Sequence, residues 1–194
     1  MKKTLSVVIS VCMIFGSIVG FGGSASGASP ELGENSSSGN NENHPLNNIK
    51  DRPVSWIEAD NKAGRGEIEI DRAQNGTPII NINRAGEGGV SANYYKEFNV
   101  NQEHVILNNY KGEAVNTKLG GTIYGNPNYN KEGAREADII LNEVTGNNRT
   151  NIDGYIEVGG KKADLVIANA NGITVGGAGF INVGRMSLIT GRSA

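Results

Sequence analysis

Short apolar runs separated by glycine and asparagine fill the chain from Val54 onward, and this pattern predicts β-strands. Glu67 to Asp71 (EIEID) alternates strictly between acidic and apolar residues, as in a strand with one buried face. Pro78 to Ile82 (PIINI) and Val105 to Leu107 are short apolar runs. Lys131 to Leu141 comes nearest to a helical pattern, but it contains a glycine and lacks a helix cap, so we expect a loop. The sequence therefore predicts an all-β protein.

The last forty or so residues carry the most regular pattern of the chain. Gly or Asn-Gly separates five apolar segments there: Tyr155 to Val158, Asp164 to Ile167, Ile173 to Val175, Phe180 to Val183 and Ser187 to Thr190. Their starts are about nine, nine, seven and seven residues apart, which is about half of the ~20-residue coil of a parallel β-solenoid. In such a fold inward Val, Ile and Leu stack in rows, and Gly and Asn occupy the corners. An antiparallel sandwich is the main structural alternative.

The N-terminal residues have the pattern of a cleavable export signal over residues 1–28. Lys2 and Lys3 precede an apolar stretch from Leu5 to Val19, and small residues follow it. Residues 29–53 are dense in Ser, Asn, Gly and Glu without apolar periodicity, so we expect a flexible polar leader there. The β-structured domain is then expected over residues 54–194.

Composition narrows the class of protein further. Cys12 is the only cysteine, so the chain that remains after signal cleavage can form no disulfide, and its stability must come from repetitive packing. The formal net charge is −2, and it becomes −4 once Lys2 and Lys3 leave with the signal. So mild an acidity, without clustered Lys and Arg, argues against nucleic acid as a partner.

Few residues are candidates for catalysis or metal binding. His44 lies in the leader and His104 beside an apolar strand, so we expect no zinc site and no Ser-His-Asp relay, and His104 is expected at a strand edge or turn. Glu67 and Glu69 alternate with isoleucines, which predicts a solvated strand face rather than a glycosidase pair. Gly176 to Gly179 (GGAG) precedes a strand-like segment and is expected to be a turn. We expect neither a metal nor a cofactor.

Four aromatic residues gather near the start of the expected solenoid: Trp56, Tyr94, Tyr95 and Phe98. They could form a platform on which a carbohydrate stacks, but aromatic residues in this position more often cover the open end of a solenoid. We favour the covering role.

Specific motifs point to a family. Residues 140–182 (ILNEVTGNNRTNIDGYIEVGGKKADLVIANANGITVGGAGFIN) closely resemble the N-terminal two-partner secretion domain of filamentous-haemagglutinin-type exoproteins, and the likeness extends over about residues 65–192. Gly89 to Asn109 resembles the family's early block. The family's first hallmark is present as Asn126, Pro127 and Asn128, and its second, N-P-N-G-I, as Asn169, Ala170, Asn171, Gly172 and Ile173.

Two substitutions and the length depart from the family pattern. Tyr129 stands where the first motif usually has Leu, and Ala170 stands where the second usually has Pro. Loss of the fixed φ of proline is expected to make that turn less pre-organised by about 0.4–1 kcal/mol. Family domains usually run beyond the position of Ala194, so a truncated gene product or a fragment is one interpretation.

The resemblance implies a single-stranded, right-handed parallel β-helix without enzyme activity or cofactor. It also implies export through the periplasm of a Gram-negative bacterium, an outer-membrane transporter barrel with POTRA domains as partner, and a final location in the medium or at the cell surface. For Asn126, Pro127, Asn128, Asn169, Asn171, Gly172 and Ile173 it leaves two roles, namely building turns and being recognised by the transporter while the chain is extended.

The activity of whole exoproteins of this kind, whether adhesion, cytolysis or contact-dependent growth inhibition, lies in regions downstream of such a domain. One alternative is a free-standing adhesin that binds a host glycan or protein. Another is a polysaccharide lyase or hydrolase on a β-helix, which the lack of a clustered Asp, Lys and Arg groove disfavours.

Overall fold

The computed structural model describes residues 8–9, 54–62 and 64–191. The predicted leader, and the predicted signal apart from the two-residue strand β1 (Val8–Ile9), lie outside these residues. Strand β1 pairs antiparallel with the last strand, β15. No helix within the described residues is long and apolar enough to span a bilayer.

Fourteen further strands and one short 3₁₀ helix make up the described part of the chain. They are β2 (Ile57–Ala59), β3 (Glu69–Arg72), β4 (Pro78–Asn81), β5 (Val90–Phe98), β6 (Val105–Asn109), β7 (Ala114–Thr117), β8 (Gly121–Tyr124), η2 (Pro127–Tyr129), β9 (Ile139–Val144), β10 (Thr150–Ile152), β11 (Tyr155–Gly160), β12 (Ala163–Asn169), β13 (Ile173–Val175), β14 (Gly179–Ile181) and β15 (Val183–Ile189).

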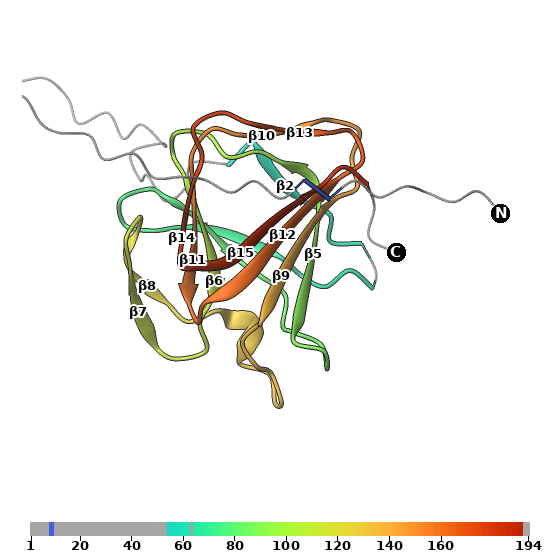
Figure 1. Ribbon diagram of the computed structural model, residues 1–194. Coiled ribbons are helices and arrows are strands. Elements are labelled where there is room, and N and C mark those ends of the chain that lie inside the picture. The colour runs from blue at the N-terminus through green and yellow to red at the C-terminus, as the bar shows by residue number, and fades with distance from the viewer. Residues whose placement is uncertain (1–7, 10–53, 63, 192–194) are drawn as a thin grey trace, which may run out of the picture.

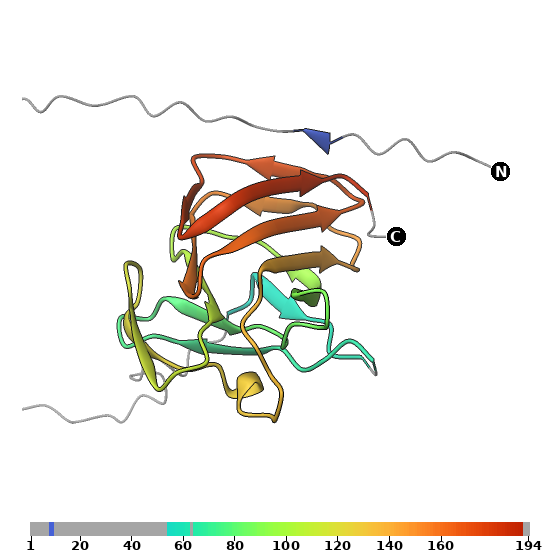
Figure 2. The same cartoon turned by 60° about the horizontal axis from the view of Figure 1, so that its bottom comes forward.

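Apart from the hairpin β7–β8, these strands form the three faces of a coil that repeats along one axis (Figures 1 and 2). The first sheet has the order β1-β15-β12-β9-β5-β2, the second sheet β14-β11-β6-β4-β3, and the third sheet β10-β13. Within each sheet the strands from successive coils are parallel. The strands that precede them are antiparallel: β2 pairs with β5 at the edge of the first sheet, and β3 pairs with β4 at the edge of the second. The all-β prediction and the parallel β-helix are therefore confirmed, and the antiparallel sandwich is excluded. The right-handed sense is the one that twisted parallel strands impose on their connections.

The two coils from β9 to β14 each contribute one strand to each of the three sheets, and this corrects the expected coil geometry. Tyr155 pairs with Gly179, so 24 residues make one turn, and the steps of seven to nine residues are about a third of a coil rather than half. The segment predicted from Phe180 to Val183 spans two strands, β14 and the start of β15. The loop that we expected from Lys131 to Leu141 is confirmed up to Asp138, but its last three residues belong to β9, which begins at Ile139.

The interior is built from rows of aliphatic side chains that stack from coil to coil. Two of these rows are Ile140, Leu165 and Met186 in the first sheet, and Val105, Ile156 and Phe180 in the second sheet. The first two members of each row are fully buried, and the third, in the last coil, is half-buried. Burying one such side chain contributes about 1.5–3 kcal/mol, so each coil gains stability by stacking on its neighbour.

The aromatic residues at the start of the helix divide between core and surface. Tyr95 and Phe98 are buried with ring centroids 4.8 Å apart, so they cannot belong to an exposed sugar platform. Burial raises the pKa of the Tyr95 hydroxyl far above its usual range. Trp56 packs partly buried against the core, and Tyr94 is half-buried beneath the guanidinium of Arg65.

A β-hairpin, β7–β8, interrupts the coil between β6 and β9 and packs on the outer face of the second sheet. Val105 pairs with Ile156, 51 positions on, because this hairpin and η2 lie between them. A second apolar cluster fills the contact; its buried members are Ala73, Ile79, Ile106 and Ile123. The hairpin therefore has a small core of its own, outside the helix.

The carboxylate of Glu157 fastens the hairpin turn to the sheet. Glu157 lies on β11 and is 4% exposed, and its two oxygens accept the backbone N–H groups of Lys118 and Leu119, each at 2.7 Å. A buried carboxylate with two such bonds is stabilising, because charge-assisted hydrogen bonds are stronger than neutral ones.

We expect Glu157→Gln to loosen the hairpin. An amide group retains one acceptor oxygen but turns an NH₂ toward one of the two backbone donors, and the cost should be about 1–3 kcal/mol. Hydrogen exchange at the Lys118 and Leu119 amides should accelerate accordingly. Glu132→Gln, at an exposed loop position, is the control and should change nothing. Unchanged protection in Glu157→Gln would contradict the assignment.

Candidate functional site

The first motif forms a turn that ties three parts of the chain together. The side chain of Asn126 is 1% exposed, and its Nδ2 donates to the carbonyls of Ile82 at 2.9 Å and Asn108 at 2.8 Å. Its Oδ1 accepts the backbone N–H of Asn128 at 2.9 Å, which caps η2, and Pro127 occupies the first turn of that helix. A proline suits this position because its fixed φ matches the helix and its missing N–H is not needed there.

The residues that follow extend this network. The Nδ2 of Asn128 donates to the carbonyl of Glu67 at 2.9 Å, and Tyr129 is buried with its hydroxyl donating to Oδ1 of Asn109 at 2.8 Å. Burial above all raises the pKa of the Tyr129 hydroxyl. The tyrosine that replaces the family's leucine thus has a polar partner in the core. Asn109, which sequence reasoning missed, also binds both backbone groups of Ala137; its signal was its place in an Asn-Asn pair directly after an apolar run.

The second motif repeats the local geometry at another corner. Asn169 is fully buried; its Nδ2 donates to the Asn148 carbonyl and to Oγ1 of Thr150, both at 2.9 Å, and its Oδ1 accepts the backbone N–H of Asn171 at 2.9 Å. Ala170 is exposed, as Pro127 is in the first turn.

The last two residues of the second motif lead into the third sheet. Gly172 has φ of 102°, a conformation that favours glycine, and an added Cβ would lie 2.9 Å from Nη1 of Arg149. Ile173 is half-buried as the first residue of β13. The glycine therefore permits both the turn and the close approach of the arginine.

In both motifs one asparagine closes a turn and binds the preceding coil at the same time. The side-chain oxygen accepts the N–H two residues on, and the side-chain amide donates to two oxygens of earlier strands or turns. The two turns lie at different corners, because Asn126 precedes β9 of the first sheet whereas Asn169 joins the first sheet to the third. The structure does not bring the seven motif residues into one site.

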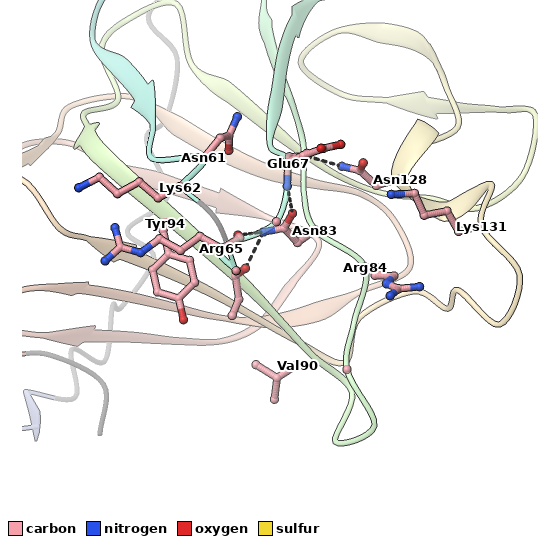
Figure 3. A pocket seen from close by; sticks show the side chains of 14 residues that line it. Asn61, Lys62, Arg65, Glu67, Asn83, Arg84, Val90, Tyr94, Asn128 and Lys131 are labelled. Atoms are coloured by element: carbon pink, nitrogen blue, oxygen red, sulfur yellow. Dashed lines mark hydrogen bonds between the residues drawn. The ribbon is translucent and has the colours of Figure 1, made fainter.

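A hollow of about 580 Å³ lies beside the first turn (Figure 3). The side chain of Asn83 lines this hollow: its Nδ2 donates to the carbonyl of Arg65 at 3.0 Å, and its Oδ1 accepts the N–H of Glu67 at 3.0 Å. Figure 3 shows Lys62 and Arg65 on one side and Arg84 and Lys131 on the other, with Asn128 near the second pair. The cations surround the hollow without converging on one point.

A buried carboxylate supports the rim of this hollow. Asp60 is 2% exposed and is paired with Arg65, and Oγ1 of Thr145 donates to it at 2.7 Å. The hydrogen bond from Thr145, together with the charges of Arg65 and Lys62, lowers the pKa of Asp60 against the opposing effect of burial. The ionised carboxylate therefore stabilises the fold.

The residues weighed for catalysis are far from forming a catalytic arrangement. His104 lies in the turn before β6 with φ of 63°, as expected for a turn residue, and its Nδ1 accepts the N–H of Tyr155 at 3.1 Å. Glu67 and Glu69 are exposed, with Ile68 buried between them, which is the predicted solvated face. Their environment indicates no acid and base pair.

Comparison with known proteins gives consistent matches. The family model of the TPS secretion domain matches residues 56–194. A 16S rRNA endonuclease CdiA of Enterobacter cloacae is 46% identical over 127 residues, which are 66% of this chain and 4% of the relative. A toxin CdiA of Yersinia pestis is 47% identical over 139 residues, 71% of this chain and 4% of the relative. The chain therefore spans about 4% of the length of these curated relatives. The crystal structure of a filamentous hemagglutinin secretion domain matches with a TM-score of 0.59 and 35% identity, covering 67% of this chain and 40% of that one.

We expect Asn126→Ala to destabilise the protein by about 2–4 kcal/mol, because it leaves two backbone carbonyls and one helix-capping N–H without their hydrogen-bond partner. Urea unfolding measures the change. Asn130→Ala, at an exposed neighbouring position, should stay within about 0.5 kcal/mol of the wild type. Equal stability of the two variants would contradict the structural role of the Asn126 side chain.

The lowered pKa of Asp60 predicts a specific acid response. The stabilising contribution is present above the unfolded pKa of about 3.9 and is lost as the pH falls through the lower folded value. Between pH 6 and pH 2.5 the wild type should therefore lose more unfolding free energy than Asp60→Asn does. Asp138→Asn is the comparison, since the pair of Asp138 with Lys161 is exposed and screened and should give a smaller difference. Parallel pH profiles of the wild type and Asp60→Asn would refute the prediction.

Proposed function

The chain belongs to the TPS secretion domain family, and on that premise we propose that it is the secretion module of a filamentous-haemagglutinin-like exoprotein. In this proposal residues 1–28 direct the chain to the periplasm of a Gram-negative bacterium, residues 29–53 are a polar leader, and residues 54–194 are the secreted β-helix. An outer-membrane transporter barrel with POTRA domains passes the chain to the cell surface or the medium.

The burial of the motif asparagines is the observation that carries the proposal. Asn126 and Asn169 are 1% and 0% exposed in the folded protein, so no transporter can reach their side chains once the turns have closed. We infer that the transporter binds the motifs while the chain is extended and that the same side chains close the corners afterwards. One set of residues would thus serve first recognition and then folding.

The coil architecture supports folding at the cell surface. Strand β9 pairs with β5 before it and β12 after it, and β12 pairs in turn with β15, so each strand needs only the preceding coil as a template. Apolar rows are buried one coil at a time as the chain emerges, which would bias movement outward without ATP. After signal cleavage no cysteine remains to form a disulfide that obstructs passage.

The activity that we propose for the whole exoprotein is based on its relatives. These relatives are CdiA toxins and nucleases, which favours contact-dependent inhibition, and the matched hemagglutinin domain favours adhesion. The matched segment is the secretion domain, so we assign it no nuclease activity. Adhesion by this domain itself is a second candidate, favoured by the exposed side chain of Tyr124 on the hairpin strand β8.

Co-expression tests the secretion role. With its cognate barrel the chain should accumulate in the medium, and without the barrel it should remain in the periplasm. Pro127→Ala removes a motif residue that is exposed in the fold, so it should lower secretion while changing stability by no more than about 1 kcal/mol. Asn130→Ala is the matched control and should be secreted normally.

Two results would count against the proposal. Equal amounts of the chain in the medium with and without the barrel would show that secretion does not need the transporter. Normal secretion of Pro127→Ala would show that the transporter does not recognise the extended motif, and the turns would then have a purely structural role.

A further inference from the structure

A groove of about 380 Å³ separates the hairpin β7–β8 from the edge of the second sheet. Its floor includes the buried side chains of Ile79 and Ile123, and its lining also includes Tyr124, Glu69 and Asp71. The volume lies within the range of about 300–1,000 Å³ that small-molecule sites occupy. The groove thus combines an apolar floor with an aromatic ring and two carboxylates.

Tyr124 offers a ring that packing within the protein does not use. Its exposed fraction is 79%, the largest among the exposed large hydrophobic residues of the described chain, while the adjacent Ile123 faces the outer apolar cluster. Its backbone is nevertheless held firmly, because its carbonyl accepts Nδ2 of Asn108 at 3.0 Å and the next N–H, of Gly125, donates to Glu113 at 2.9 Å. A ring on a fixed backbone can bind a flat apolar surface at little entropic cost.

Glu69 and Asp71, on β3, also line the groove and supply hydrogen-bond acceptors; one oxygen of Asp71 already accepts the backbone N–H of Arg72 at 2.7 Å. They stand two positions apart on β3 and so face the same way, and both are exposed. Neither forms an ion pair with a residue of the described chain. Ionised carboxylates accept hydrogen bonds only, which suits a ligand rich in hydroxyl donors.

The charge of the groove excludes acidic ligands. Arg72 is the one cation in its lining, and its guanidinium is buried and binds the carbonyl of Gly76 and the carboxylate of Glu103. Two exposed carboxylates therefore determine the sign of the local potential, and an anion in the groove would be repelled.

We propose that this groove binds a neutral saccharide, whose apolar ring face stacks on Tyr124 while its hydroxyl groups donate to Glu69 and Asp71. The stacked face has C–H groups, and the edge of the sugar ring carries the donors, so an exposed aromatic ring and two carboxylates in the lining of one groove match both. This binding is independent of secretion and gives the secreted domain an adhesive property of its own.

Binding of the full chain to an array of neutral oligosaccharides and their sialylated counterparts tests the site. At least one neutral glycan should bind, its sialylated form should bind more weakly, and Tyr124→Ala should weaken binding by about tenfold or more through loss of the stacked area. Tyr124→Phe retains the ring and should bind within about threefold of the wild type. Tyr155→Ala is the control, since Tyr155 is a 45% exposed tyrosine that is not part of the groove.

A second pair of measurements separates this site from folding and from secretion. Circular dichroism and barrel-dependent secretion of Tyr124→Ala should match those of the wild type, because the ring is exposed. Absence of binding to every neutral glycan, a preference for the sialylated forms, or full binding by Tyr124→Ala would each overturn the proposal and leave the secretion role untouched.

Discussion

The fold depends on pairing the backbone groups that are buried where one coil turns into the next. A parallel ladder satisfies the N–H and C=O groups along each strand, but at a corner the chain changes direction and the ladder stops. Asn126 and Asn169 solve the same problem with one side chain, since the amide reaches oxygens of earlier residues and the oxygen accepts the N–H two positions on. Rows of aliphatic residues give the coils their stability, and these two asparagines fix the bends at their own two corners.

The same requirement explains how the long coil accommodates its insertion. The hairpin β7–β8 leaves the helix after β6 and returns through Asn126, which again binds the ends of the neighbouring strands. Because Glu157 and a separate apolar cluster hold the hairpin to the outer face, the interior rows continue undisturbed beneath it. The insertion thus adds a groove and an exposed tyrosine without changing the stacking that secretion would require.

Sequence reasoning located the strands better than it located their arrangement. Alternation found β3, because a half-buried strand leaves a period of two in its own residues. Short apolar runs found β4 and β6, which are buried throughout, and most strands after Tyr155. The number of strands per coil was wrong, since a step of seven to nine residues fits two faces or three until pairings such as that of Tyr155 with Gly179 fix the turn. Asn109 and Glu157 escaped notice because their hydrogen-bond partners lie far away in the sequence.

By itself the sequence determined the class of fold, the repetitive packing without disulfides, and the two motifs that mark the family. All of these depend only on the order of neighbouring residues and on composition. Only the tertiary structure decided which polar residues are buried. The motifs single out Asn126 and Asn169 but do not show that their side chains are buried, and Tyr95 and Tyr124 are both tyrosines on strands. Burial of the first pair and of Tyr95, and exposure of Tyr124, follow from which coil or hairpin lies on top of each, and that depends on contacts between residues distant in sequence.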